Sequence, residues 1–216
     1  MKIGLFGGTF NPFHNGHIRI IEHVKDTFRL EKLFLIPSST PPHKPDTNLA
    51  PANERFEMVR QSIEGREGFF VSDKELTRKG PSFTIDTLEE FKADLGEKTD
   101  LFLLMGSDAF FDIITWRRKD QIFDTAKIIV MLRGHFKNHD DAFVSFIDEY
   151  ISKGYIFNKK DNTFIHETKQ NIILCRVPRI DISSTMIRER VKYGKPIEGL
   201  VPASVLKIIH EKELYQ

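Results

Sequence analysis

Two glycines and two histidines near the N-terminus have the residue types and spacing that most directly suggest chemistry. They lie in Gly7–His17, which reads GGTFNPFHNGH and follows the apolar run Ile3–Phe6. Glycines at such a turn let backbone N–H groups come close to a phosphate, and the start of a following helix adds a partial positive charge. His14 and His17 are three residues apart, so a helix places both rings on one face. The stretch predicts a phosphate site with two additional hydrogen-bond donors.

Two alternative roles of the histidine pair stay open at the level of sequence. His14 and His17 could be structural residues whose ring nitrogens are satisfied by neighbouring groups, or they could be two ligands of a zinc ion. A zinc site needs further ligands, and no cysteine stands near the pair. The stretch also differs from the common phosphate-binding patterns GxGxxG and GxxxxGKS/T. The motif therefore predicts anion binding without naming a reaction.

A second candidate for phosphate binding lies far downstream, in Ile182–Arg188, which reads ISSTMIR. Hydroxyl residues at a helix start, here Ser183 and Ser184, would expose N–H and O–H donors to another phosphate. Arg188 on the first helical turn could clamp phosphate oxygens with its planar guanidinium. The alternative is an ordinary serine N-cap followed by a solvated arginine.

Short apolar runs bounded by turn residues alternate with amphipathic segments along most of the chain. The runs predict strands at Lys2–Phe6, Leu33–Ile36, Phe69–Ser72, Leu101–Met105, Ile128–Leu132 and Ile172–Val177. Apolar spacing predicts helices over 18–28, 56–63 and 85–95, the second with Asn53 as its N-cap. This alternation predicts an α/β fold with a Rossmann-like parallel sheet covered by helices on both faces. Ligands of such sheets bind at the carboxyl ends of strands, where Gly7–His17 and Gly106–Asp108 lie.

We expect a single domain over residues 1–216, with an inserted excursion at 134–171 and a small C-terminal helical part at 183–216. Within the excursion, Phe143 and Ile147 have helical spacing, and two short apolar pieces flank Lys159–Asn162, which predicts a helix and a hairpin. The helical part should contain one helix with Gly194 as its C-cap and another that begins near Pro202, which suits the first helical position.

Composition narrows the class of protein. Apolar residues make up 40% of the 216 residues and charged residues 29%, which is typical of a globular domain. The net charge of +1 disfavours a broad nucleic-acid footprint. The single cysteine, Cys175, excludes an internal disulfide and fits a reducing compartment. We find no signal peptide and no membrane-spanning run, so we expect a cytoplasmic protein with no membrane or nucleic-acid partner.

Together these motifs resemble the HxGH superfamily of nucleotidylyltransferases, and more narrowly the bacterial nicotinate-mononucleotide adenylyltransferases. The narrower resemblance is carried by Ile36–Lys44 (IPSSTPPHK), Glu75–Thr84 (ELTRKGPSFT) and Gly106–Asp108 followed by Trp116. It covers residues 1–133 and 172–216. It implies a nucleotidylyltransferase fold and the transfer of AMP from ATP to nicotinate mononucleotide, giving deamido-NAD and pyrophosphate.

The resemblance also implies roles for individual residues. It makes His14, His17 and Arg188 catalytic. The implied ATP-binding residues are Gly7, Gly8, Thr9, Phe10, His17, Gly106, Asp108, Arg133, Ile182, Ser183, Ser184 and Arg188. The implied acceptor-binding residues are Asn11, Lys44, Phe83, Thr84 and Trp116, with Trp116 stacked on the pyridine ring. Mg²⁺ is implied as cofactor, held mainly by the ATP phosphates and without metal ligands from the protein.

Several alternatives stay open. Trp116 could be a packing anchor and Lys44 a solvated loop residue, and Phe83 stands where the family often has tyrosine. The acceptor could be nicotinamide mononucleotide or phosphopantetheine, or the chain could be a non-catalytic nucleotide-binding module. The excursion at 134–171 is longer than the family pattern, so it either shapes an oligomer contact, covers the ATP side, or is a tolerated insertion without a role. The oligomeric state is open, a homo-oligomer included.

Overall fold

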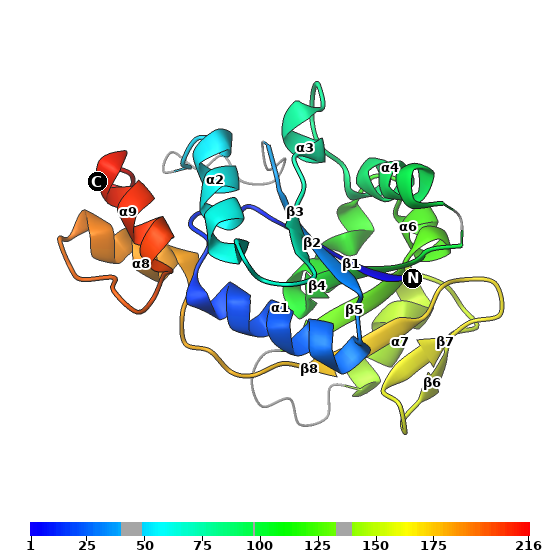
Figure 1. Ribbon diagram of the computed structural model, residues 1–216. Coiled ribbons are helices and arrows are strands. Elements are labelled where there is room, and N and C mark those ends of the chain that lie inside the picture. The colour runs from blue at the N-terminus through cyan, green and yellow to red at the C-terminus, as the bar shows by residue number, and fades with distance from the viewer. Residues whose placement is uncertain (40–48, 97, 133–139) are drawn as a thin grey trace. The chain divides into compact units, whose positions relative to one another are not determined.

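A computed structural model describes residues 1–39, 49–96, 98–132 and 140–216 (Figure 1). The chain divides into two compact units. The first unit consists of Met1–Phe6, Phe28–Glu31 and Phe83–Arg179, and the second consists of Gly7–Thr27, Lys32–Ser82 and Ile180–Gln216. No helix in the described part of the chain is long and apolar enough to cross a membrane.

The strands of the first unit follow one another in the order β1-β4-β5-β8-β7-β6. Their bounds are Lys2–Gly8 (β1), Asp100–Gly106 (β4), Lys127–Leu132 (β5), Ile156–Asn158 (β6), Thr163–Ile165 (β7) and Ile172–Arg176 (β8). The first four in this order pair in parallel, with Leu5 opposite Leu103 and Val130 opposite Leu174. Residues 128–131 of β5 are fully buried. A strand buried on both faces needs apolar side chains on both, which explains the continuous apolar runs in the sequence.

The predicted parallel Rossmann-like sheet is confirmed, and an antiparallel hairpin extends it at one edge. β6 and β7 form an antiparallel hairpin, and β7 pairs antiparallel with β8. The hairpin lies in the excursion, where the sequence predicted a hairpin but gave no sign that it would join the sheet. The other predicted strands of this unit are confirmed to within two residues at each end.

Four helices and one 3-10 turn complete the described part of the first unit. They are α4 (Thr84–Leu95), α5 (Ser107–Asp112), η1 (Ile113–Thr115), α6 (Lys119–Thr125) and α7 (Asp140–Tyr150). On α4 the buried residues include Ile85, Leu88 and Phe91, the stripe that predicted this helix.

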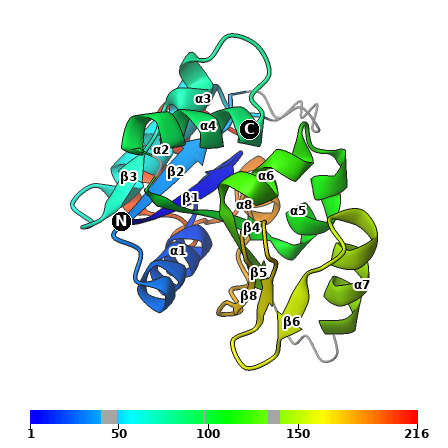
Figure 2. The ribbon, with the colours of Figure 1, turned by 90° about the vertical axis from the view of Figure 1, so that its right-hand side faces the viewer.

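The excursion forms the predicted helix and hairpin, and both are packed into the first unit (Figure 2). Phe143 of α7 is fully buried, and its ring stacks on Phe111 with centroids 4.9 Å apart. Phe164 of β7 is buried, and it lies opposite Ile172 in the sheet. Helix α7 and the hairpin therefore supply part of the apolar core of this unit.

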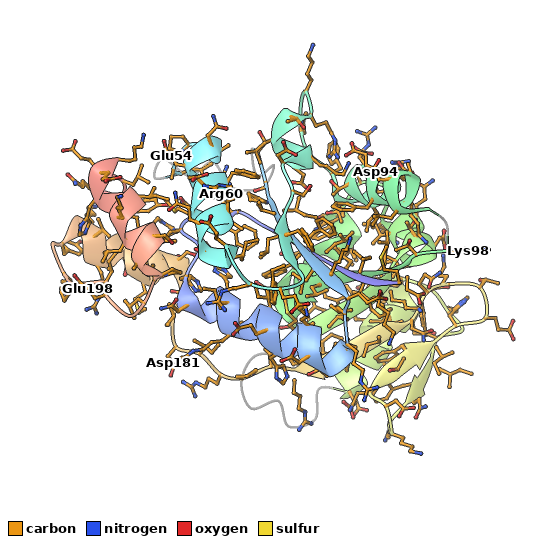
Figure 3. All side chains as sticks on the ribbon, in the orientation of Figure 1. Glu54, Arg60, Asp94, Lys98, Asp181 and Glu198 are labelled. Atoms are coloured by element: carbon orange, nitrogen blue, oxygen red, sulfur yellow. The ribbon has the colours of Figure 1, made fainter. Side chains whose placement is uncertain are left out.

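The second unit contains the parallel strand pair β2 (Lys32–Pro37) and β3 (Phe69–Val71). Its helices are α1 (Asn15–Phe28), α2 (Ala52–Ile63), α3 (Lys74–Thr77), α8 (Ser184–Lys192) and α9 (Ala203–Glu211). Helix α9 packs against α2, where Lys212 pairs with Glu54 at 3.5 Å (Figures 1 and 3). Helices α8 and α9 confirm the predicted C-terminal helical part.

Three predicted helix ends differ in detail. Helix α2 begins at Ala52 with Pro51 as its N-cap and has no side-chain cap, so the N-cap prediction for Asn53 is wrong. The C-cap of α8 is Tyr193, and Gly194 follows it with φ +61°, the left-handed conformation that glycine tolerates. Pro202 is the N-cap of α9, one residue before the helix.

We expect Phe143→Ala to lower the free energy of unfolding by about 3–5 kcal/mol, because it removes a fully buried ring and leaves a cavity. Urea denaturation followed by circular dichroism measures the effect. The matched control is Val144→Ala on the same helix, where the side chain is 41% exposed, and its effect should stay within about 0.5 kcal/mol. Equal effects of the two substitutions would show that α7 is not part of the cooperative core.

Candidate active site

Gly7 and Gly8, the two glycines of the predicted turn, are the last residues of β1, and the loop of residues 9–14 follows them. Gly8 is required by the loop itself, since a Cβ at this position would stand 2.8 Å from the ring carbons of buried Phe10. Gly7 is different. It is exposed, and a Cβ there would meet no atom of the described residues within 4 Å. Packing against those residues does not explain this glycine, whereas close approach of a ligand to the backbone would.

The two histidines hold each other through reciprocal hydrogen bonds. The backbone N–H of His14 donates to Nδ1 of His17 at 3.2 Å, and the backbone N–H of His17 donates to Nδ1 of His14 at 3.3 Å. The rings stack with centroids 3.7 Å apart and planes 23° apart. The sequence-predicted pair therefore comes together on the first turn of α1, as its spacing indicated.

This pairing fixes the tautomer of both rings. A ring nitrogen that accepts a hydrogen bond from an N–H carries no proton, so the proton of the neutral imidazole lies on Nε2. Both histidines then present Nε2–H as the donor on the far side of the ring. The structural role of the pair is therefore observed, because each Nδ1 accepts a backbone N–H at the start of α1, while a donor role of Nε2–H toward a phosphate stays a prediction.

Backbone N–H groups at the start of α1 form hydrogen bonds within the protein. The sequence predicted that the N–H groups of this helix end would bind phosphate. Three of them have protein partners instead. The N–H of His14 donates to Nδ1 of His17, and the N–H of His17 donates to the carbonyl of His14 at 2.9 Å and to Nδ1 of His14 at 3.3 Å. The N–H of Asn15 donates to the carbonyl of Leu200 at 3.0 Å.

Neighbouring residues fix the orientation of the two rings. Phe13 stacks on His17 with planes 11° apart, and Phe10 meets the same ring edge-on at 5.3 Å. Gly16 makes room for His14, because a Cβ at Gly16 would stand 2.9 Å from Nδ1 of His14. The glycine between the two histidines is thus explained by the ring that lies against it.

The second predicted motif docks on the same loop. Ser183 is the N-cap of α8, the alternative that the sequence left open beside phosphate binding, and its hydroxyl accepts from the N–H of Met186 at 3.2 Å. The hydroxyl of Ser184 donates to the carbonyl of Pro12 at 2.9 Å, and Nη1 of Arg188 donates to the carbonyl of Asn11 at 2.9 Å. Two segments about 170 residues apart in sequence are joined by these bonds, which place Arg188 and Ser184 at the loop with the histidines.

Asn11 is held by the protein on both of its oxygen atoms. Its Oδ1 accepts from the N–H of Ala50 at 3.0 Å and from the hydroxyl of Tyr215 at 2.8 Å. Its carbonyl accepts from Arg188. The side chain is 4% exposed. These contacts make Asn11 an anchor of the loop, while its contact with a substrate stays a prediction.

Arg55 is a residue of this region that sequence reasoning missed. It is fully buried on α2, and its guanidinium donates to the carbonyls of Ala50 (3.0 Å), Thr9 (2.8 Å) and Ser39 (2.8 Å). Burial lowers the pKa of the Arg55 guanidinium, and nearby Tyr215 raises it, but the group stays charged at neutral pH. The sequence contained one indication of this role. Arg55 and Met58 are three residues apart, a helical spacing that places the arginine on the buried apolar face of α2.

The first unit holds the remaining described candidates. Asp108 follows the end of β4 and is exposed, and a Cβ at Gly106 would overlap its Oδ1, so this glycine lets the carboxylate fold back over the strand end. Phe83 is the N-cap of α4, Thr84 is its first residue, and no side chain caps this helix. Trp116 is half-buried and follows η1.

Two arginines that sequence reasoning missed join the Trp116 segment to the start of α4. The guanidinium of Arg117 lies 4.7 Å from the ring centroid of Phe83. Arg118 pairs with Asp86 and Glu89 of α4, each at 2.8 Å. The structure therefore brings the segment of Trp116 next to Phe83 and Thr84 within the first unit. Lys44 and Arg133, two of the predicted site residues, lie outside the described residues.

The described part of the chain supports neither a zinc site at the histidine pair nor a reactive cysteine. No group of three or more His, Cys, Asp and Glu side chains within it could hold a metal ion, so a zinc site at the histidine pair lacks a third ligand there. Burial raises the pKa of the Cys175 thiol to about 11, so this cysteine stays protonated and unreactive at neutral pH.

We expect Gly16→Ala to displace the His14 ring and break the reciprocal pairing, because the new Cβ would lie too close to Nδ1. Long-range ¹H–¹⁵N spectra of the histidine rings measure the loss of the fixed Nε2–H tautomer. Gly7→Ala is the matched control, since its Cβ meets open space, and it should leave these spectra unchanged. Unchanged ring signals in Gly16→Ala would contradict the assigned role of Gly16.

Comparisons with known proteins identify the family of this chain. The cytidylyltransferase-like family model matches residues 5–190. A probable nicotinate-nucleotide adenylyltransferase of Desulfatibacillum aliphaticivorans is 38% identical over 221 residues, covering 100% of both chains. One of Clostridium botulinum is 36% identical and covers 100% of this chain and 98% of its own. The solved Plasmodium falciparum nicotinic acid mononucleotide adenylyltransferase with NaAD shares the fold, with a TM-score of 0.74, 18% identity and coverage of 99% and 97%. The chain belongs to the cytidylyltransferase-like family and, within it, to the nicotinate-nucleotide adenylyltransferases.

Proposed function

We propose that this chain transfers AMP from ATP to nicotinate mononucleotide, giving nicotinate adenine dinucleotide and pyrophosphate, in NAD biosynthesis. The observation that carries the proposal is the arrangement at the 9–14 loop. Two fixed imidazole donors and one guanidinium, from His14, His17 and Arg188, are assembled there by direct bonds. The names of the full-length relatives support the same reaction.

The reaction proposed is a direct displacement. A phosphate oxygen of the mononucleotide attacks the α-phosphorus of ATP, the bond from that phosphorus to the bridging oxygen breaks, and pyrophosphate leaves. The protein contributes positioning and stabilisation of developing negative charge. The Nε2–H groups of His14 and His17 would bind the phosphate oxygens on which charge grows, without giving up a proton. Because Nδ1 of each ring is already engaged, these donors need no rearrangement at the moment of reaction.

We assign the departing pyrophosphate to the start of α8. Ser183 and Ser184 lie at the N-terminus of this nine-residue helix, where the helix dipole favours negative charge. Arg188 stands on its second turn, and the bond to the carbonyl of Asn11 orients its guanidinium. Ile182 precedes the cap. The remaining proposed ATP contacts are the backbone of Gly7, Gly8, Thr9 and Phe10, together with Gly106, Asp108 and Arg133.

The acceptor assignment rests on Trp116 and on the start of α4. In our proposal Trp116 stacks on the pyridine ring, and the uncapped N–H groups at Phe83–Thr84 bind the nicotinate carboxylate. Backbone donors suffice for this contact, so the absence of a tyrosine hydroxyl at Phe83 does not weaken it. Lys44 and Asn11 complete the proposed acceptor side, with Lys44 at the mononucleotide phosphate.

The proposal includes Mg²⁺ as cofactor and a cytoplasmic location, where ATP is available. Mg²⁺ keeps several water ligands and usually binds through substrate phosphates and one or two carboxylates. The described residues present exposed single carboxylates such as Asp108 but no cluster of ligands, a donor set that suits an ion carried by the ATP phosphates. When bound, the ion would neutralise phosphate charge.

Product analysis tests the proposed function directly. With ATP and Mg²⁺, the purified chain should form nicotinate adenine dinucleotide and pyrophosphate from nicotinate mononucleotide. The kcat/KM with nicotinamide mononucleotide should be lower by about tenfold or more, because the amide leaves charge-assisted donors unpaired. A higher kcat/KM with the amide would reassign the acceptor, and ATP binding without any product would favour a non-catalytic module.

We expect His17→Ala to lower kcat by about 100- to 1000-fold, the loss caused by removing one preorganised transition-state donor. The variant also loses the Nδ1 acceptor of the His14 N–H and the stacking on Phe13, so kcat is compared per folded molecule, after circular dichroism has shown that the fold is kept. His210→Ala is the matched control, because His210 is exposed at the end of α9. Near-normal kcat in His17→Ala would refute the assigned role of this ring.

A further inference from the structure

The end of the chain reaches back to the 9–14 loop. Beyond α9, the N–H of Leu214 donates to the carbonyl of Ile209 at 3.0 Å, which turns the last residues back along the helix. Tyr215 follows with φ +68°, and its hydroxyl donates to Oδ1 of Asn11 at 2.8 Å. The ion pair between Lys212 and Glu54 fixes the same turn to α2. The penultimate residue is thus part of a defined structure.

Hydrogen bonds hold the loop backbone on both sides of Phe10. The carbonyl of Thr9 accepts from Arg55, and the carbonyl of Asn11 accepts from Arg188. Phe10 between them has φ +49°, a left-handed conformation that a bulky residue keeps only where its surroundings impose it. Releasing one of these contacts would let Phe10 relax toward a more ordinary conformation.

Phe10 links the loop to the catalytic ring. Its side chain is 4% exposed and meets the ring of His17 edge-on, with centroids 5.3 Å apart. A change in the backbone at Phe10 would therefore move the Phe10 ring, which packs against the ring of His17. The contacts run in one continuous series from the Tyr215 hydroxyl through Asn11 and Phe10 to the imidazole.

We infer that Tyr215 is a positioning residue, whose hydroxyl fixes Asn11 and Phe10 and thereby the orientation of the His17 ring. The inference rests on the proposed function, because the ring that it orients is the proposed phosphate donor. Tyr215 does not touch the reacting atoms in this assignment. Its effect should fall on kcat, where alignment of the donor counts, more than on the KM for ATP.

The test compares Tyr215→Phe with Tyr193→Phe, a matched control whose ring is 68% exposed at the end of α8. Tyr215→Phe should lower kcat by about three- to tenfold, the effect of one hydrogen bond expressed in the transition state, with the KM for ATP unchanged. The ¹⁵N signals of the His17 ring should shift in the same variant and not in the control. A chain that ends at Leu214 should show at least the same fall in kcat.

The outcomes separate the inference from the proposed function. If the wild-type chain forms no dinucleotide, the proposed function fails, and the His17 signals of Tyr215→Phe alone decide the inference. A shift of those signals supports it, and unchanged signals overturn it. If the wild-type enzyme is active, an unchanged kcat in Tyr215→Phe overturns the inference. A lower thermal midpoint with a normal kcat per folded molecule also overturns it, because Tyr215 would then have a purely structural role.

Discussion

The oxygen atoms of Asn11 are the contacts on which the rest of the site depends. They accept hydrogen bonds from Ala50, Arg188 and Tyr215, which belong to three separate parts of the chain. The partners at 188 and 215 are 177 and 204 residues away in sequence. The form of the 9–14 loop therefore depends on contacts from α8 and from the segment after α9. Bringing together residues at such sequence separation costs chain entropy, which the packed structure must offset.

The histidine pair changes how the N-terminus of α1 could bind an anion. Backbone N–H groups at such an end usually bind an anion themselves. Here those of His14 and His17 donate to ring nitrogens, and that of His17 also donates to the carbonyl of His14. In the proposed function the rings then offer donors farther out, on Nε2. An imidazole extends the reach of the helix end by the width of the ring. It also removes the need for a flexible side chain, since stacking with Phe13 limits the motion of His17.

The sequence predicted those parts of the structure that follow from local patterns. Buried parallel strands must be apolar on both faces, so β5 was recognisable from its apolar run. The Ser183 cap was recognisable because serine at a helix start has a local partner, the N–H of Met186. Arg55 escaped prediction because its three partners are backbone carbonyls at positions set by the tertiary fold. Asn53 failed as an N-cap because the chain enters α2 through Pro51 two residues earlier. The tautomers of His14 and His17 likewise depend on atomic geometry that no residue pattern contains.

The position of Tyr215 has a practical consequence for handling this protein. An affinity tag fused directly after residue 216 would extend from the backbone that sets the Tyr215 hydroxyl against Asn11. A tag of that kind would compete with the turn after α9 for space and for hydrogen bonds. Met1 is 47% exposed at the start of β1, which makes the N-terminus the better fusion point for kinetic work.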